Sequence, residues 1–179
     1  MFNLFGKKDE GIKVEDIIWV SSAGKWNGLA EIWKQDPQTI FIFWFEESLQ
    51  QAQQFLFEKQ LPDIEIATVR ETHYNHIQNK PIVFAEHFPL RKKEQEIFQS
   101  LHVSEAKVLS ALDEPIFKKF GADKIIQMLR QLGMNENESI RHSMISSAIK
   151  NAQIKIEGEN ILDHTAQSQA EWLNRNLPA

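Results

Sequence analysis

Apolar residues recur at helical spacing between Ile140 and Glu157, near the end of the 179-residue chain. They fall at Ile140, Met144, Ile145, Ala148, Ile149, Ala152 and Ile156. This spacing predicts an amphipathic helix with one broad apolar stripe. A stripe of this kind has to be covered, so the helix should fold back on the rest of the chain, form a dimer or bind another protein.

Upstream of this helix, strand-like and helix-like patterns alternate along the chain. Residues 39–45 (TIFIFWF) are mostly β-branched or aromatic, which is typical of a central strand covered on both faces. Further strands are predicted at 16–22, 64–69, 81–88 and 106–112. Further helices are predicted at 25–35, 46–60, 91–101, 115–132 with a break at Gly121, and 161–177. The polar stretch 70–80 is predicted to be a loop.

This alternation predicts an α/β fold, with a Rossmann-like, mainly parallel sheet and helices on both of its faces. We divide the chain into a flexible N-terminal lead-in at 1–15, a Rossmann-like α/β domain at 16–134 and a helical C-terminal extension at 135–179. Gly133 is expected to cap the helix that precedes this boundary.

Composition narrows the possible functions. Hydrophobic residues make up 42% of the chain, enough for a real core, and the net charge of −5 argues against a nucleic-acid partner. The chain has no cysteine, which excludes disulfides, thiolate nucleophiles and cysteine metal sites. No segment reaches the roughly 18 apolar residues of a membrane span, and the N-terminus lacks the features of a signal peptide. We therefore expect a cytoplasmic protein without an integral membrane segment.

A distinctive series of residues runs from Leu132 to Glu157, reading LGMNENESIRHSMISSAIKNAQIKIE. It resembles the SecA family of preprotein translocase ATPases, where a second nucleotide-binding, helicase C-terminal-like domain runs into a helical scaffold. The matching residues are Leu132, Gly133, Met134, Ile140, His142, Ala148, Ile149, Ala152, Gln153, Lys155 and Glu157. Upstream matches are Leu109, Ser110, Leu112, Asp113, Phe120, Gly121, Asp123 and Ile125. The resemblance covers residues 108–157 and implies a helicase C-terminal-like fold.

The ATPase motifs of that family are missing from this sequence. There is no GxxxxGK[ST] loop to hold phosphates, and no strand ends in an acidic pair that could hold magnesium and the attacking water. The segment between Phe88 and Leu109 also lacks the Gly-Arg sequence that supplies arginines to the transferring phosphoryl group. We therefore expect no ATP hydrolysis by this chain, no cofactor and no metal.

An anion could bind where Ser22, Gly24 and Lys25 follow a predicted strand and open a helix. Backbone amides at a helix N-terminus attract anions, and the ammonium group of Lys25 would add to that attraction. The motif lacks the first glycine of a phosphate-binding loop, and Ser22 could equally be the N-cap of the helix. We favour a structural role for these residues.

Two further groups carry ionisable side chains. Glu86 and His87 lie at the end of a predicted strand and could shuttle protons, but no nucleophile motif accompanies them. His73 and His76, with Glu71 nearby, have a spacing that zinc can use, but no third ligand cluster is evident. We favour structural roles here as well.

We interpret the chain as a non-catalytic SecA-like module that acts in protein–protein interaction or scaffolding and is linked to protein translocation. Its partner would be another protein, or a second copy in a homodimer through the C-terminal helices. The residues expected to make the contact are Met144, Ile145, Ile149 and Trp172. Two alternatives stay open: a nucleotide- or anion-binding domain without hydrolysis, and a small enzyme centred on Glu86 and His87.

Overall fold

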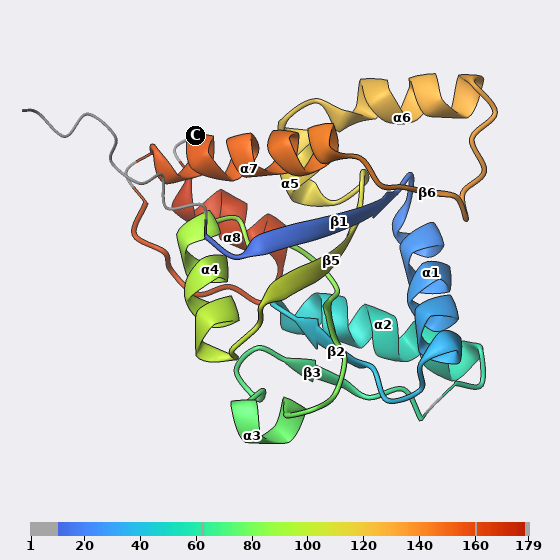
Figure 1. Cartoon of the computed structure of the whole chain (residues 1–179). Helices are drawn as coiled ribbons and strands as arrows, with labels where there is room; N and C mark the ends of the chain where they lie inside the picture. The colour runs from blue at the N-terminus through green and yellow to red at the C-terminus, as the bar shows by residue number, and fades with distance from the viewer. Residues whose placement is uncertain (1–10, 62, 160, 178–179) are drawn as a thin grey trace, which may run out of the picture.

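A six-stranded sheet forms the centre of the computed structural model, which describes residues 11–61, 63–159 and 161–177 (Figure 1). The strands lie in the order β3-β2-β4-β5-β1-β6. They are β1 Lys13–Trp19, β2 Ile40–Phe43, β3 Ile66–Thr68, β4 Ile82–Phe84, β5 Glu105–Ala111 and β6 Ser139–Ile140. Neighbouring strands are parallel except for β6, which runs antiparallel to β1. The predicted α/β fold with a mainly parallel sheet is therefore confirmed.

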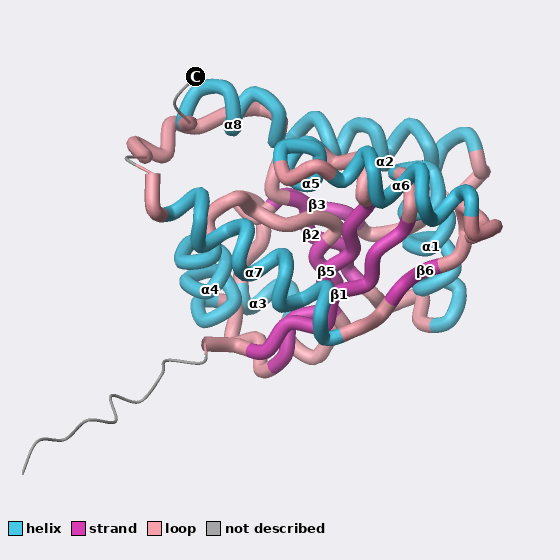
Figure 2. The backbone as a smooth tube through the Cα atoms, turned by 90° about the horizontal axis from the view of Figure 1, so that it is seen from above, coloured by secondary structure: helices cyan, strands magenta, loops and turns pink. Residues whose placement is uncertain are grey.

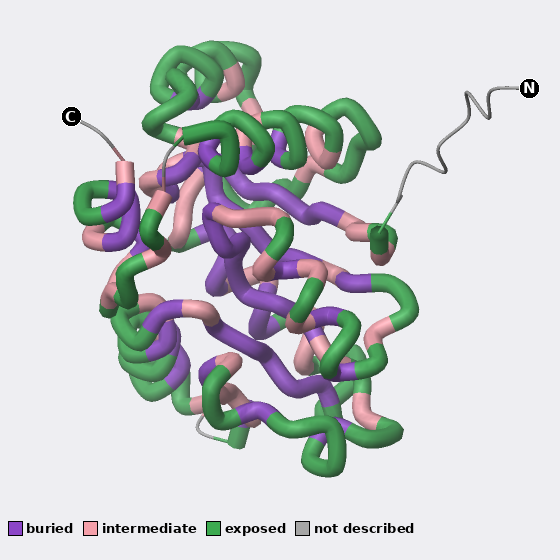
Figure 3. Tube along the Cα trace, turned by 90° about the vertical axis from the view of Figure 1, so that its left-hand side faces the viewer, coloured by how far each residue is buried: buried purple, intermediate pink, exposed green. Residues whose placement is uncertain are grey.

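Helices surround this sheet. They are α1 Ser22–Gln35, α2 Glu46–Glu58, α3 Tyr74–Ile77, α4 Arg91–Ser100, α5 Pro115–Lys119, α6 Ala122–Gln131, α7 Ser143–Glu157 and α8 Gln169–Asn176. Figure 3 shows buried backbone through the centre of the molecule and exposed backbone on the outer turns of the helices. No helix in the described part of the chain is long and apolar enough to cross a membrane.

The side chains of strand β2 show why helices cover both faces of the sheet. Its side chains alternate between the faces of the sheet, and all four are fully buried. Phe41 and Phe43 pack into a core cluster with residues of α1 and α2, whereas Ile40 and Ile42 pack into a second cluster with residues of α3 and α4. The prediction of a central strand covered on both faces is confirmed.

The C-terminal part of the chain closes one end of the sheet. Helix α7 contacts α4 and β1, and α8 contacts α5 (Figure 2). A third core cluster joins Phe45 and Phe88, which follow strands β2 and β4, to Ile156 of α7 and Trp172 of α8. The segment predicted as a separate helical extension also supplies β6 to the edge of the sheet.

Several element boundaries differ from the sequence-based expectations. Strand β1 begins at Lys13, inside the predicted flexible lead-in, because its backbone pairs with β5 from Glu105 onward; the rest of that lead-in, residues 1–10, lies outside the described residues. Helix α7 begins at Ser143, where the ring of His142 accepts a hydrogen bond from the Met144 amide. A short helix, α3, occupies part of the predicted loop 70–80.

The predicted helix at 161–177 is largely wrong. Only Gln169–Asn176 is helical, because Ser168 adopts an extended backbone conformation and its Oγ accepts a hydrogen bond from the Glu171 amide, which caps α8 there. The predicted break at Gly121 is confirmed, since this glycine takes a φ of 83° between α5 and α6. Gly133, with a φ of 81°, directly follows the C-cap of α6, as expected for a helix-terminating glycine.

Candidate functional site

The carboxyl ends of parallel strands are where open α/β sheets commonly bind ligands. The structure brings two of the sequence-predicted candidates to this edge: Ser22, Gly24 and Lys25 follow β1, and the pair Glu86 and His87 follows β4. The turn after β5 adds Asp113 and Glu114, two carboxylates that the sequence had not marked as part of a site.

An internal carboxylate occupies the N-terminus of α1. The backbone amide and the Oγ of Ser22 both donate to the carboxylate of Asp113, at 3.0 and 2.7 Å. The N-cap is Ser21 rather than Ser22, since the Oγ of Ser21 accepts a hydrogen bond from the Gly24 amide. Asp113 thus supplies, from within the chain, the negative charge that a helix N-terminus attracts.

Gly24 is closely covered by the loop between α6 and β6. A Cβ atom at this position would lie 1.9 Å from the carbonyl oxygen of Glu136, so no larger residue fits without moving backbone. Nearby, the side-chain amide of Asn27 donates to Asn137 of the same loop. The first turn of α1 is therefore covered by protein, and its glycine serves close packing.

Lys25 points into the molecule and is only 2% exposed. Its Nζ atom donates to the carbonyl oxygen of Ala85 at 2.9 Å and to Oε1 of Glu114 at 2.6 Å. Burial raises the pKa of Glu114, and the charge of Lys25 opposes that rise. The one cation in the proposed anion site is thus already paired with a buried carboxylate.

Glu86 binds the start of α2. Its Oε1 accepts hydrogen bonds from the amides of Trp44 and Phe45, and its Oε2 accepts one from the hydroxyl of Ser48. Burial raises the pKa of Glu86 to about 7, although the charge of Lys25 opposes this effect. The carboxyl group therefore acts as a hydrogen-bond acceptor for the N-terminal turn of α2.

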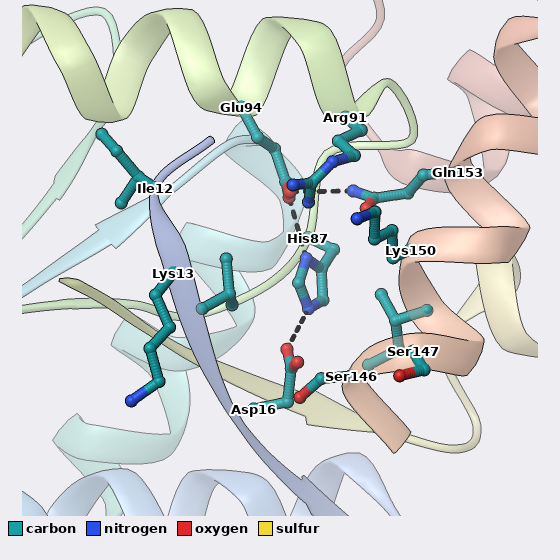
Figure 4. Close-up of a pocket in the computed structure, with 12 residues that line it drawn as sticks. Ile12, Lys13, Asp16, His87, Arg91, Glu94, Ser146, Ser147, Lys150 and Gln153 are labelled. Atoms are coloured by element: carbon teal, nitrogen blue, oxygen red, sulfur yellow. Dashed lines mark hydrogen bonds and ion pairs between the residues drawn. The ribbon is translucent and has the colours of Figure 1, made fainter. Parts of the chain in front are cut away.

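His87 belongs to a different network. Its Nε2 lies 2.7 Å from Oδ1 of Asp16, and its Nδ1 lies 2.9 Å from Oε1 of Glu94 (Figure 4). Burial alone would lower the pKa of His87, but the charges and hydrogen bonds of Glu94 and Asp16 raise it to about 10. Glu86 and His87 are thus adjacent in sequence but engage separate partners, which gives no support to a shared proton shuttle.

The His87 network attaches α7 to the body of the protein. The side-chain amide of Gln153 donates to Oε2 of Glu94 and to the carbonyl oxygen of Phe88, both at 2.8 Å. A small hollow of about 160 Å³ opens beside these groups, and Figure 4 shows Arg91 and Lys150 among the residues that line it. The side chains at the base of this hollow are already hydrogen-bonded to one another.

Sequence reasoning missed Asp16, Glu94 and Gln153. A weak signal existed, because Gln153 lies four residues after Ile149 and three before Ile156, on the buried side of the α7 stripe. A polar residue in such a stripe needs a buried partner. The sequence does not reveal that the partner comes from α4, 59 residues away.

The four residues predicted to contact a partner have different environments. Ile149 and Trp172 are buried in the core, so the expectation that they form an interaction surface is wrong. The indole nitrogen of Trp172 donates to Asp163, which fixes the ring inside the protein. Ile145 is half-buried against a core cluster, whereas Met144 is 73% exposed. The stripe of α7 thus folds back in part on its own chain, and Met144 and Ala148 remain accessible.

Two residues of the predicted zinc motif, His76 and Glu71, make other contacts. His76 lies 2.7 Å from Glu65, and the carboxylate of Glu71 accepts hydrogen bonds from the amide and the hydroxyl of Thr68. Within residues 11–61, 63–159 and 161–177, no group of three histidine or acidic side chains is arranged to hold a metal ion.

The fold and these contacts define an α/β domain whose strand ends are covered by its own C-terminal segment. No family model matches the chain. Part of it is similar to protein translocase subunit SecA of Endomicrobium trichonymphae, with 40% identity over 55 residues, and of Desulforapulum autotrophicum, with 44% identity over 50 residues. SecA 1 of Alkaliphilus metalliredigens is 36% identical over 55 residues.

The chain therefore carries a SecA-related segment, as the residues between 108 and 157 had indicated. The matches cover 28 to 31% of this chain. They span about 6% of the length of these relatives, so the shared ancestry concerns a small part of SecA.

Proposed function

We propose that this chain is a non-catalytic, SecA-related module that acts in the cytoplasm by binding another protein during protein translocation. The link to translocation rests on its relatives, which are named as protein translocase subunits. The non-catalytic part rests on the chain itself, which lacks a phosphate-binding loop.

One observation carries the proposal: the carboxylate of Asp113 binds the amide and hydroxyl of Ser22, where a phosphate would otherwise bind the helix N-terminus. Lys25 is likewise neutralised by Glu114. A nucleotide would have to displace two internal carboxylates, and electrostatic repulsion between those carboxylates and the phosphates would oppose its binding. Binding of another protein does not require these carboxylates to leave the carboxyl edge of the sheet.

Calorimetry tests the absence of nucleotide chemistry. We expect no heat of binding on titration of ATP, ADP or inorganic phosphate to millimolar concentration, and no phosphate release from ATP. Full-length SecA from Alkaliphilus metalliredigens serves as the positive control. Saturable heat with ATP or ADP would instead favour the alternative of a nucleotide-binding domain, and phosphate release would contradict the proposal outright.

A binding assay tests the positive part of the proposal. The purified chain, immobilised, should retain purified SecA or a purified preprotein, and Met144→Glu should weaken that retention if α7 takes part. Phe57→Glu is the matched control, because Phe57 is 79% exposed on α2, which Figures 1 and 2 show well apart from α7. Light scattering on the chain alone distinguishes a homodimer from a monomer. In the binding assay, failure to retain either SecA or the preprotein would count against a translocation role.

A further inference from the structure

One surface of the protein combines exposed apolar side chains with unpaired cations. Ile125 and Met128 of α6 and Leu132, its C-cap residue, are exposed, and they recur at i, i+3 and i+7. They therefore form a stripe on one side of the helix, while Ala122 and Ile126 face the core. Phe120, at the end of α5, is also exposed. Figure 1 shows α6 on the outside of the molecule, away from the sheet.

Two lysines lie on this side of the molecule: Lys124 on α6 and Lys155 on α7. Neither forms an ion pair with a residue in the described part of the chain. Lys155 instead places its Nζ atom 6.0 Å from the ring centre of Phe120, which brings α7 to the same surface. We call the four apolar residues and these two lysines the α5–α6 surface.

The positive charge of the α5–α6 surface is local. The whole chain carries a net charge of −5, so these two uncompensated lysines contrast with the rest of the molecule. Asp123, the acidic residue in the first turn of α6, lies about 140° around the helix from Met128. Lys124 is four residues before Met128 and shares its side of the helix. The cations therefore lie beside the apolar stripe, and the nearest acid on α6 points away.

We propose that the α5–α6 surface docks an acidic amphipathic helix of a partner protein, which would place its apolar residues on the stripe and its carboxylates against the lysines. The stripe from Ile125 to Leu132 extends about 10 Å, which matches two turns of such a helix. Met128 has a flexible side chain that adapts to a partner's shape, and charge complementarity at the rim would steer association. This inference rests on the proposed function and names the chemistry of the partner.

A synthetic helical peptide provides the test, with leucine at i, i+3, i+4 and i+7 and glutamate beside this stripe. Its control has the same composition in scrambled order. Fluorescence anisotropy at 0.1 M salt should show micromolar binding of the first peptide and at least tenfold weaker binding of the second. Raising the salt to 1 M should weaken binding about tenfold or more, because the Debye length falls from about 10 to about 3 Å.

Matched variants locate the surface. Met128→Glu, and separately the pair Lys124→Glu with Lys155→Glu, should each weaken peptide binding at least tenfold, with folding checked by circular dichroism. Phe57→Glu and Lys92→Glu, which change an exposed apolar residue and an exposed lysine elsewhere, should bind like the wild type. Equal binding by all variants would overturn the proposal, as would equal binding of the scrambled peptide.

Vesicles with equal parts of phosphatidylglycerol and phosphatidylcholine separate a lipid surface from a protein partner. Binding to these vesicles without binding to the peptide would overturn the proposal in favour of an anionic membrane. If the peptide does not bind but the chain still retains SecA or a preprotein, only the docking surface is rejected. If neither binds, the proposed function fails as well.

Discussion

Replacing Lys25 with methionine should destabilise the fold strongly, because it leaves the carboxylate of Glu114 buried without its cation. The two side chains lie 2.6 Å apart and are 2% and 8% exposed. The second carboxylate oxygen of Glu114 has no hydrogen-bond partner, so the ammonium group is its main compensation. Breaking a buried ion pair from one side typically costs about 3 to 5 kcal/mol.

That free energy is large compared with the total stability of an ordinary domain, which is about 5 to 15 kcal/mol. For a chain of this length it corresponds to a fall in Tm of about 6 to 20 °C. Burial already raises the pKa of Glu114, and the loss of Lys25 should raise that pKa further. The Glu114 carboxylate can then escape the penalty by taking up a proton, so the cost of Lys25→Met should be smaller at pH 5 than at pH 8.

Urea unfolding of Lys25→Met, Glu114→Gln and the double variant measures the coupling between the two side chains. The double variant should be more stable than the sum of the two single effects implies. Lys34→Met is the control, because Lys34 pairs with Glu31 at a similar 2.7 Å but is 53% exposed, and such pairs contribute about 1 kcal/mol or less. Additive effects, or equal costs for Lys25→Met and Lys34→Met, would refute the reasoning.

Three further outcomes are expected. Gly24→Ala should lower the free energy of unfolding by about 1 to 3 kcal/mol, since its Cβ would clash with the backbone of Glu136, whereas Gly158→Ala, whose Cβ would make only ordinary van der Waals contacts, should change little. Gln153→Met should increase hydrogen exchange in α7, and unchanged exchange would show that the hydrogen bonds to α4 and Phe88 do not hold it. The raised pKa of His87, about 10 against 6.5, contributes stability below pH 6.5 that is lost as pH rises towards 10. NMR should find this imidazole charged at pH 8, and titration near pH 6.5 would contradict the contacts described.

Local patterns in the sequence predicted most of the elements, because each depended on residues close together in the chain. The apolar run 39–45 became β2, and the break at Gly121 separates α5 from α6. The helix expected at 161–177 failed for a physical reason. Ile161 and Ala166 pack against the third core cluster from irregular backbone, and the spacing of apolar residues cannot distinguish that from a helical face.

The buried networks could not be predicted in the same way. From the sequence, Lys25 looked like an anion ligand because it follows a predicted strand and opens a helix. Its actual partner, Glu114, lies 89 residues later in the chain. The Glu86–His87 pair looked like one site, yet the two side chains bind Ser48 in one direction and Asp16 in the other. Contacts between side chains of different strands and helices decide whether an ionisable group is available for chemistry. Those contacts depend on the order of the strands in the sheet.

The carboxyl edge of the sheet is covered by the chain itself, and this affects whether the stability of the fold depends on a ligand. The first turn of a helix has unpaired amides, and a buried lysine requires an anion; in a nucleotide-binding protein the phosphates can meet both needs. Here Asp113 binds Ser22, and Glu114 binds Lys25, so both needs are met within the chain. We therefore propose that the fold gains no stability from nucleotide, and millimolar ATP should leave its Tm unchanged. A ligand at 100 times its Kd would instead add about 2.7 kcal/mol, and a corresponding rise in Tm would show that the internal carboxylates give way to phosphate.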